Sequence, residues 1–207
     1  MLDLTTEEVR RTALAIAPEL EQYAAHYNET KYPPQELARL RAVFAKPECV
    51  QEADVVAALV WKYGHTGKAR FPAHQRDLAN RIFCFWPANA AIPGESAQAQ
   101  FNRWQKLLGR TSFITICFLL HLAHPRELPI LDQHNYRAVN WHLATVRPGW
   151  RVKRKPSRFS DLLLVRNFTV ALLAGWEPQV GSKAPAADVF DRYLMMYGKA
   201  LSRSSRA

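Results

Sequence analysis

An aspartate stands at the start of a predicted helix in the segment PILDQHNYRAV, residues Pro129 to Val139. Asp132 follows an apolar triplet and precedes a helical pattern that continues to about Ala144. A carboxylate in this position can cap the helix by accepting hydrogen bonds from its first free N–H groups. The helix N-terminus also favours the ionised form of the carboxylate, which suits a group that stabilises a developing cation. Capping and catalysis are compatible uses of Asp132, and the residues alone leave both open.

The first turn after Asp132 carries further polar side chains. His134 and Asn135 could position water or a phosphate beside the carboxylate, or simply be solvated. Arg137 lies five residues after Asp132, and a salt bridge that holds the helix against its neighbours is its favoured role. These residues together define a candidate polar site.

The charge balance favours a polyanionic partner. The chain has 28 Lys and Arg against 18 Asp and Glu, a formal net charge of +10, and cationic surfaces gain affinity for nucleic acid by releasing counterions. The excess is concentrated in a predicted loop, residues 147–160, where Trp150 and Phe159 are interleaved with cations that could line a DNA backbone or form an ordinary solvated loop. These cations are Arg151, Lys153, Arg154, Lys155 and Arg158.

Composition excludes several other classes of protein. A hydrophobic content of 48% is too high for general disorder. The three cysteines lie far apart without a C-x-x-C pair, so we expect reduced core residues and no metal or cofactor. The apolar run 113–123 is too short to span a bilayer, and the N-terminus lacks a secretory apolar region. We therefore expect a soluble, cytoplasmic protein.

Helical periodicity recurs along the chain and alternating strand patterns are missing, which predicts an all-α fold. Thr5 or Thr6 caps the first helix, and Pro33 and Pro34 open the second. Further helices are expected over residues 52–63, 72–85, 97–108, 113–123, 132–144 and 161–175, with a last one that places Phe190, Tyr193, Leu194 and Tyr197 on one face. Segments 86–94 and 176–187 are expected as linkers.

The order of these elements resembles the helix-hairpin-helix DNA glycosylase superfamily. A buried helix, a short extended link with proline, an aspartate at a helix start and an arginine five residues later follow one another between about Trp104 and Leu143. Within that superfamily, PILDQHNYRAV looks most like the motif of the adenine-specific, MutY-type members. The resemblance implies a two-lobed helical fold and a hydrolase that releases a base from DNA.

The resemblance also implies roles for particular residues. The family's catalytic aspartate falls on Asp132. Its hairpin, a proline with two glycines whose amides grip a DNA phosphate, falls on LLGRTS, residues 107–112, where only Gly109 is present and Arg110 can substitute. Thr111 stands where bifunctional members carry a Schiff-base lysine, which implies a monofunctional enzyme. The family's iron–sulfur cluster loop is absent, because no cysteine follows Cys117.

The implied chemistry needs a carboxylate and a base pocket. Breaking an N-glycosidic bond builds positive charge on the sugar, and a nearby carboxylate stabilises that cation or orients the attacking water. The target base must first leave the stack and enter a pocket with aromatic walls. Segment 58–75 offers such rings, although ordinary buried aromatics are the alternative reading. The pocket candidates are Trp61, Tyr63, His65, Phe71 and His74, with His134 and Asn135 beside Asp132.

We therefore expect one glycosylase-like domain over residues 1–207. One lobe would combine the N- and C-terminal helices, and a central lobe would cover about 96–145. The substrate would be DNA, as a duplex with a flipped base or as a single strand, that carries a damaged, mispaired or modified base. Two rivals remain: a DNA-binding module of the same fold without catalysis, and a helical interaction protein whose basic loop meets an acidic protein.

Overall fold

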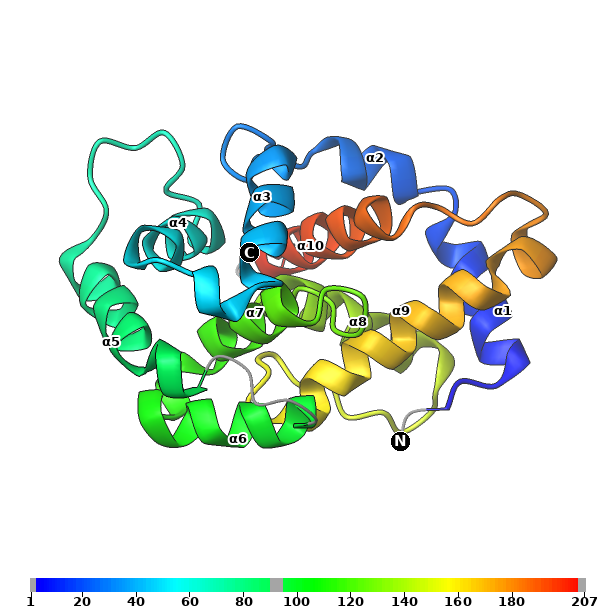
Figure 1. The fold of residues 1–207 in the computed structure, drawn as a ribbon. Helices are drawn as coiled ribbons and strands as arrows, with labels where there is room; N and C mark the ends of the chain where they lie inside the picture. The colour runs from blue at the N-terminus through cyan, green and yellow to red at the C-terminus, as the bar shows by residue number, and fades with distance from the viewer. Residues whose placement is uncertain (1–2, 90–94, 205–207) are drawn as a thin grey trace. The chain divides into compact units, whose positions relative to one another are not determined.

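A computed structural model describes residues 3–89 and 95–204 of the chain. All regular structure within these residues is helical, as Figure 1 shows, which confirms the prediction of an all-α fold. The chain forms two compact units. Unit 1 combines the residues up to Tyr27 with those from Pro129 onward, and unit 2 comprises Asn28–Leu128.

The bounds of unit 2 differ from those expected for a central lobe at about 96–145. Unit 2 begins at Asn28, and the helix that follows Asp132 belongs to unit 1. The physical reason is packing: that helix, α8 (Gln133–Val146), makes its most extensive contacts with the C-terminal helix α10 (Ala187–Ser204), and the two lie side by side in Figure 1. The sequence of α8 alone does not indicate that α10 is the helix it packs against.

Unit 1 is built from five helices among its described residues. Besides α8 and α10 these are α1 (Thr6–Ile16), α2 (Leu20–Ala25) and α9 (Phe159–Val180). Helix α1 packs along α9, and α10 packs on α2 as well as α8. Thr5 caps α1 as predicted: its hydroxyl accepts from the Glu8 N–H, and the Glu8 carboxylate accepts from the Thr5 N–H. The predicted apolar face of α10 is confirmed by its buried members Phe190, Tyr193 and Leu194.

Helix α9 is longer than predicted. It begins at Phe159, continues through Gly175 and Pro178, and ends at Val180, followed by the C-cap Gly181 in the left-handed conformation. The prediction of a helix end at Gly175 was therefore wrong. A Cβ at Gly175 would lie 2.6 Å from Val9 Cγ1, so this glycine permits the close crossing of α1 and α9 instead. Pro178 lies in the last turn of this helix and has no N–H to donate to the carbonyl of Ala174, so the helix loses one hydrogen bond there.

Helix α9 is also the one helix in the described residues whose length and composition would allow it to cross a membrane. Its buried side chains include Leu162, Val165, Phe168 and Leu172. They pack inside unit 1.

Unit 2 contains the remaining described helices. They are α3 (Pro34–Phe44), the short 3₁₀ helix η1 (Pro47–Cys49), α4 (Glu52–Lys62), α5 (Ala73–Asn89), α6 (Ala97–Leu108), the 3₁₀ helix η2 (Arg110–Ser112) and α7 (Phe113–Ala123). Helix α5 extends beyond the predicted end at Phe85 and includes Pro87, because the buried Trp86 anchors this turn by donating to the Pro47 carbonyl. The rest of the predicted linker, residues 90–94, lies outside the described residues.

The cysteines were expected in the core, and this holds only for Cys117. Cys49 and Cys84 are exposed. Cys49 ends η1 and Cys84 lies on the outer face of α5, positions that periodicity alone did not mark as exposed.

Candidate functional site

Asp132 is the N-cap of α8. Residues 129–131 before it form no regular structure, and its own backbone is extended at φ −137° and ψ 178°. Its Oδ1 accepts hydrogen bonds from the backbone N–H groups of His134 at 2.6 Å and Asn135 at 2.9 Å. Both bonds go to one oxygen, and no described residue donates to Oδ2. The half-buried carboxylate is therefore oriented by two amides while its second oxygen keeps its lone pairs for another partner.

Asn135 holds the segment around Asp132 rather than lining a pocket. It is almost fully buried, at 1% exposure. Its Oδ1 accepts from the Asp132 N–H at 2.9 Å, and its Nδ2 donates to the Ile130 carbonyl. These bonds complete a capping box with Asp132. Since both ends of the amide are occupied inside unit 1, Asn135 is a positioning residue, and the expectation that it would contact a base is not met.

His134 and Arg137 join the first turn of α8 to α10. Burial lowers the pKa of His134, so the ring is neutral near pH 7 and its Nδ1 accepts from Arg137 Nη1 at 3.1 Å. The same Nη1 donates to the Gly198 carbonyl at 2.8 Å. Through these two hydrogen bonds Arg137 joins α8 to α10, and its expected salt bridge remains a prediction.

Gly198 of α10 lies very close to the backbone of His134 in the first turn of α8. A Cβ at this position would lie 1.9 Å from the carbonyl oxygen of His134. Only glycine allows the α10 backbone to touch the first turn of α8 here. The residues that hold Asp132 are thus themselves fixed by α10, which no sequence pattern around Asp132 revealed.

The predicted aromatic wall of segment 58–75 lies in unit 2. Trp61 is 4% exposed, lies parallel to Phe118 with ring centroids 5.4 Å apart, and donates its indole N–H to the Pro33 carbonyl. It is a core residue, so its proposed place in a base pocket is corrected. Tyr63 is half-buried and shares a hydrogen bond of 2.6 Å with the Thr115 hydroxyl.

His65 and Phe71 meet edge to face, with ring centroids 5.8 Å apart, and both are half-buried. Burial lowers the pKa of His65, and its buried Nδ1 has no hydrogen-bond partner among the described residues. His74 is exposed. The proposed contact of these rings with a base remains a prediction.

The predicted hairpin is a short connection between α6 and α7. Helix α6 ends at Gly109, whose φ of 81° favours glycine, and η2 leads directly into α7. Gly109, Arg110 and Thr111 are exposed, and a Cβ on Gly109 would meet nothing within 4 Å. The Gly109 N–H donates to the Gln105 carbonyl at 2.9 Å, while the side of Gly109 on which a Cβ would stand is open.

The basic segment is a loop, as predicted. Its five candidate cations, Arg151, Lys153, Arg154, Lys155 and Arg158, are all exposed. Phe159, which the sequence offered as a stacking ring, is buried at the start of α9 and so cannot stack on a ligand. Trp150 is half-buried, and its indole N–H donates to Asn140 Oδ1 at 3.2 Å.

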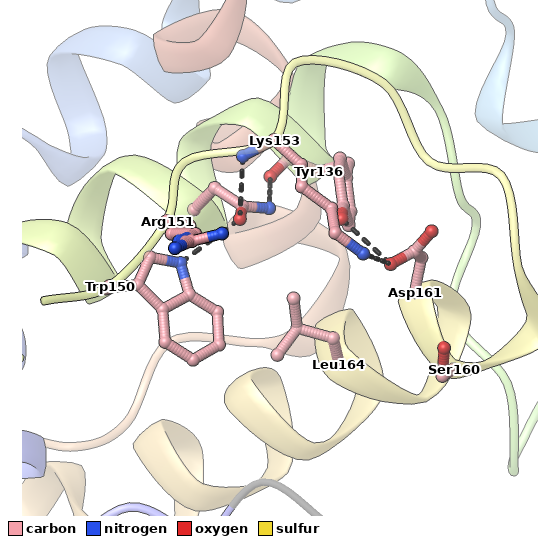
Figure 2. A pocket seen from close by; sticks show the side chains of 8 residues that line it. Tyr136, Trp150, Arg151, Lys153, Ser160, Asp161 and Leu164 are labelled. Atoms are coloured by element: carbon pink, nitrogen blue, oxygen red, sulfur yellow. Dashed lines mark hydrogen bonds and ion pairs between the residues drawn. The ribbon is translucent and has the colours of Figure 1, made fainter.

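A pocket of about 300 Å³ lies between this loop, α8 and α9 in unit 1 (Figure 2). Its lining residues are Tyr136, Asn140, Trp150, Arg151, Lys153, Ser160, Asp161 and Leu164. The sequence marked Trp150, Arg151 and Lys153 as candidates but did not mark Tyr136, Asn140 and Asp161. The signal for two of them was present: Tyr136 and Asn140 follow Asp132 at intervals of four, so they share its side of α8.

Asp161 forms the polar end of this pocket. Its Oδ1 accepts from the Tyr136 hydroxyl at 2.9 Å and from Lys153 Nζ at 3.4 Å, and its Oδ2 accepts from the N–H groups of Ser157 and Arg158. Burial acts to raise the pKa of Asp161, but these hydrogen bonds outweigh it and the net pKa is lowered. Burial and the neighbouring carboxylate raise the pKa of Tyr136, so its hydroxyl keeps its proton.

The described residues, 3–89 and 95–204, contain no group of three or more His, Cys, Asp or Glu side chains that could hold a metal ion. Comparisons of the chain with protein-family models, with curated proteins and with solved structures find no match.

Proposed function

We propose that this chain is a monofunctional DNA glycosylase that uses Asp132 to release a damaged, mispaired or modified base by hydrolysis. The observation that carries the proposal is the geometry of Asp132. Two backbone amides hold its Oδ1 at the positive end of α8 and so orient the carboxylate, while Oδ2 accepts no bond from the described residues.

The reaction needs little more than such a carboxylate. As the bond between the sugar C1′ and the base nitrogen breaks, the electron pair leaves with the base and positive charge develops on the sugar. The fixed charge of Asp132 stabilises that cation. A water oxygen then bonds to C1′, one of its protons is released, and the departing base gains a proton. The products are an abasic site and a free base, and Asp132 is unchanged at the end of the cycle.

Two further features support DNA as the substrate. The turn at Gly109 in unit 2 offers open backbone between two helices, and the loop 147–158 in unit 1 presents exposed cations. Both suit a phosphate backbone, because cations bind phosphates in protein–DNA complexes and the turn also carries the exposed Arg110. Each unit therefore carries a surface feature that suits DNA.

The direct test is a base-release assay on a panel of duplexes. Each duplex carries one damaged, mispaired or modified base, and alkali afterwards cleaves the strand at any abasic site. We expect cleavage on at least one member of the panel. A complete lack of cleavage, together with salt-dependent binding to the same duplexes, would favour the second candidate below.

That second candidate is a DNA-binding protein of the same helical type without catalysis. The capping box between Asp132 and Asn135 favours it, because a complete box gives Asp132 a sufficient structural role. A third reading, a helical protein that binds an acidic protein through the same loop, predicts no affinity for DNA at moderate salt. Binding measured against salt concentration separates these two.

The residue after the hairpin predicts the outcome of a trapping experiment. Thr111 stands where a Schiff-base amine would be needed, and threonine cannot form an imine with the sugar. Borohydride added during turnover should therefore trap no covalent protein–DNA adduct, as judged by a band shift on a denaturing gel. A trapped band would assign a lyase step to another amine, and Lys106 is the exposed candidate on α6.

The basic loop predicts a change in salt dependence. Arg154 and Lys155 are exposed, whereas Lys153 contacts Asp161 and should be left in place. The double variant Arg154→Gln, Lys155→Gln should bind DNA more weakly, and its log–log salt slope should flatten by about 0.9 for each phosphate that the loop no longer neutralises. The matched control is Arg166→Gln, Lys183→Gln, two exposed cations outside the loop. Equal slopes for both double variants would exclude the loop from backbone binding.

A further inference from the structure

The pocket beside Asp161 has an apolar part and a cationic rim. Figure 2 shows Trp150 and Leu164 on either side of its open part, away from the contacts among Lys153, Tyr136 and Asp161. Arg151 and Lys153 line the same pocket and are exposed. Its volume, about 300 Å³, is at the lower end of the range for small-molecule sites.

The aromatic wall is held in place before any ligand arrives. The indole N–H of Trp150 donates to Asn140 Oδ1, and the Arg147 guanidinium lies over the indole ring, 5.7 Å from its centroid. Arg147 is itself fixed by an ion pair with Glu8 at 2.7 Å. A ring fixed in this way loses little conformational entropy when another ring stacks on it.

The cationic rim can respond to an anion. Lys153 Nζ lies 3.4 Å from Asp161 Oδ1, longer than a strong charge-assisted hydrogen bond, and its side chain is 55% exposed. Asp161 is stabilised without it by Tyr136 and by two backbone amides. Lys153 can therefore turn toward a phosphate at little cost, and with Arg151 it supplies one positive charge more than Asp161 neutralises.

We propose that this pocket binds one nucleotide, with the base between Trp150 and Leu164 and its phosphate on Arg151 and Lys153. The same chemistry could come from a free nucleotide or from one residue of a DNA strand. Tyr136 and Asn140 place the pocket about one to two helical turns from Asp132, or about 6–12 Å along the α8 axis. The site is distinct from the Asp132 carboxylate, so its test does not depend on base release.

The binding test uses three probes: deoxyadenosine monophosphate, deoxyadenosine and deoxyribose 5-phosphate. Ligand-observed NMR on the full chain should show the mononucleotide binding more tightly than either fragment. The variant Trp150→Leu should weaken mononucleotide binding about tenfold, the scale of removing one base–aromatic stack. The matched control is Trp141→Leu, since Trp141 is 45% exposed on α8 and lies outside the pocket.

A second variant distinguishes loss of the base stack from disorder of the loop, because Trp150→Leu can cause both. Leu164→Phe fills the apolar part of the pocket without touching the polar contacts, and it should weaken mononucleotide binding to a similar degree. The double variant Arg151→Gln, Lys153→Gln should bind the mononucleotide more weakly, but its affinity for the nucleoside should not change. The proposal would be overturned if Trp150→Leu and Trp141→Leu bound the mononucleotide with equal affinity. It would also be overturned if deoxyribose phosphate bound as tightly as the nucleotide, because that result indicates a charge patch only.

A fluorescent single-stranded tetranucleotide distinguishes the two sources. If Leu164→Phe lowers the affinity for the tetranucleotide as much as the affinity for the mononucleotide, the pocket binds a residue of the strand. If it lowers only the affinity for the mononucleotide, the pocket binds a free nucleotide. Asp132→Asn should leave mononucleotide binding unchanged in both cases, so a failure of the glycosylase proposal and a failure of this one give different results.

Discussion

Replacing Asp132 by Asn is expected to lower base release at least about 100-fold, the scale of losing one preorganised electrostatic group. The asparagine keeps the size of the side chain, and its Oδ1 can still accept from the N–H groups of His134 and Asn135. Asparagine also caps helices about as well as aspartate. The variant should therefore melt within a few degrees of the parent and bind DNA at least as tightly, because one phosphate-repelling charge is gone.

The matched control is Asp188→Asn, which removes an exposed carboxylate from the same unit and should leave base release unchanged. The measurements are initial rates of base release on the best duplex of the panel and melting curves, each for the parent, Asp132→Asn and Asp188→Asn. Full base release by Asp132→Asn would remove Asp132 from the mechanism and reduce its role to capping. An equal loss in both variants would point to a general effect of charge instead.

Gly198→Ala is expected to cause the largest loss of stability among single-methyl changes in unit 1. Its new Cβ would lie 1.9 Å from the His134 carbonyl oxygen, a backbone atom that cannot rotate away. Helices α8 and α10 must then separate. We expect a cost of about 3 kcal/mol, the upper end for overpacking, which corresponds to a melting temperature lower by about 6–12 °C for a chain of this length.

Gly175→Ala provides the comparison. There the new Cβ would meet the Val9 side chain at 2.6 Å, and a side chain can shift more easily than a backbone carbonyl. Both changes gain the same helix propensity, about 1 kcal/mol, from replacing glycine by alanine. A smaller loss at Gly175 than at Gly198 is therefore the expected order in thermal melting. The reverse order would mean that α10 does not touch α8 as described.

Gly198→Ala should also lower base release below the melting transition. The new Cβ would clash with the carbonyl oxygen of His134, and His134 supplies one of the two N–H groups that hold Asp132 Oδ1. Activity measured well below the melting temperature separates this displacement from simple unfolding.

The sequence by itself determined the local features of this protein. Helix starts at Thr5, Pro34 and Asp132 follow from residues whose side chains or fixed φ act within one turn, and the structure confirms them. The end of α6 at Gly109 and the loop character of 147–158 are equally local. Such features depend on neighbours three or four residues apart, so one stretch of sequence contains all the information needed.

Tertiary structure decided what depends on distant residues. Gly175 resembles a helix end and Gly198 has no local signal, yet each lies inside a helix at a close crossing whose partner is distant in the sequence. Trp61 became a core residue because Phe118 covers it, and Asn135 became part of a cap because Ile130 accepts its amide. The pocket around Asp161 exists only because α8, the basic loop and α9 converge, and the free energy of that packing is not encoded in any single segment.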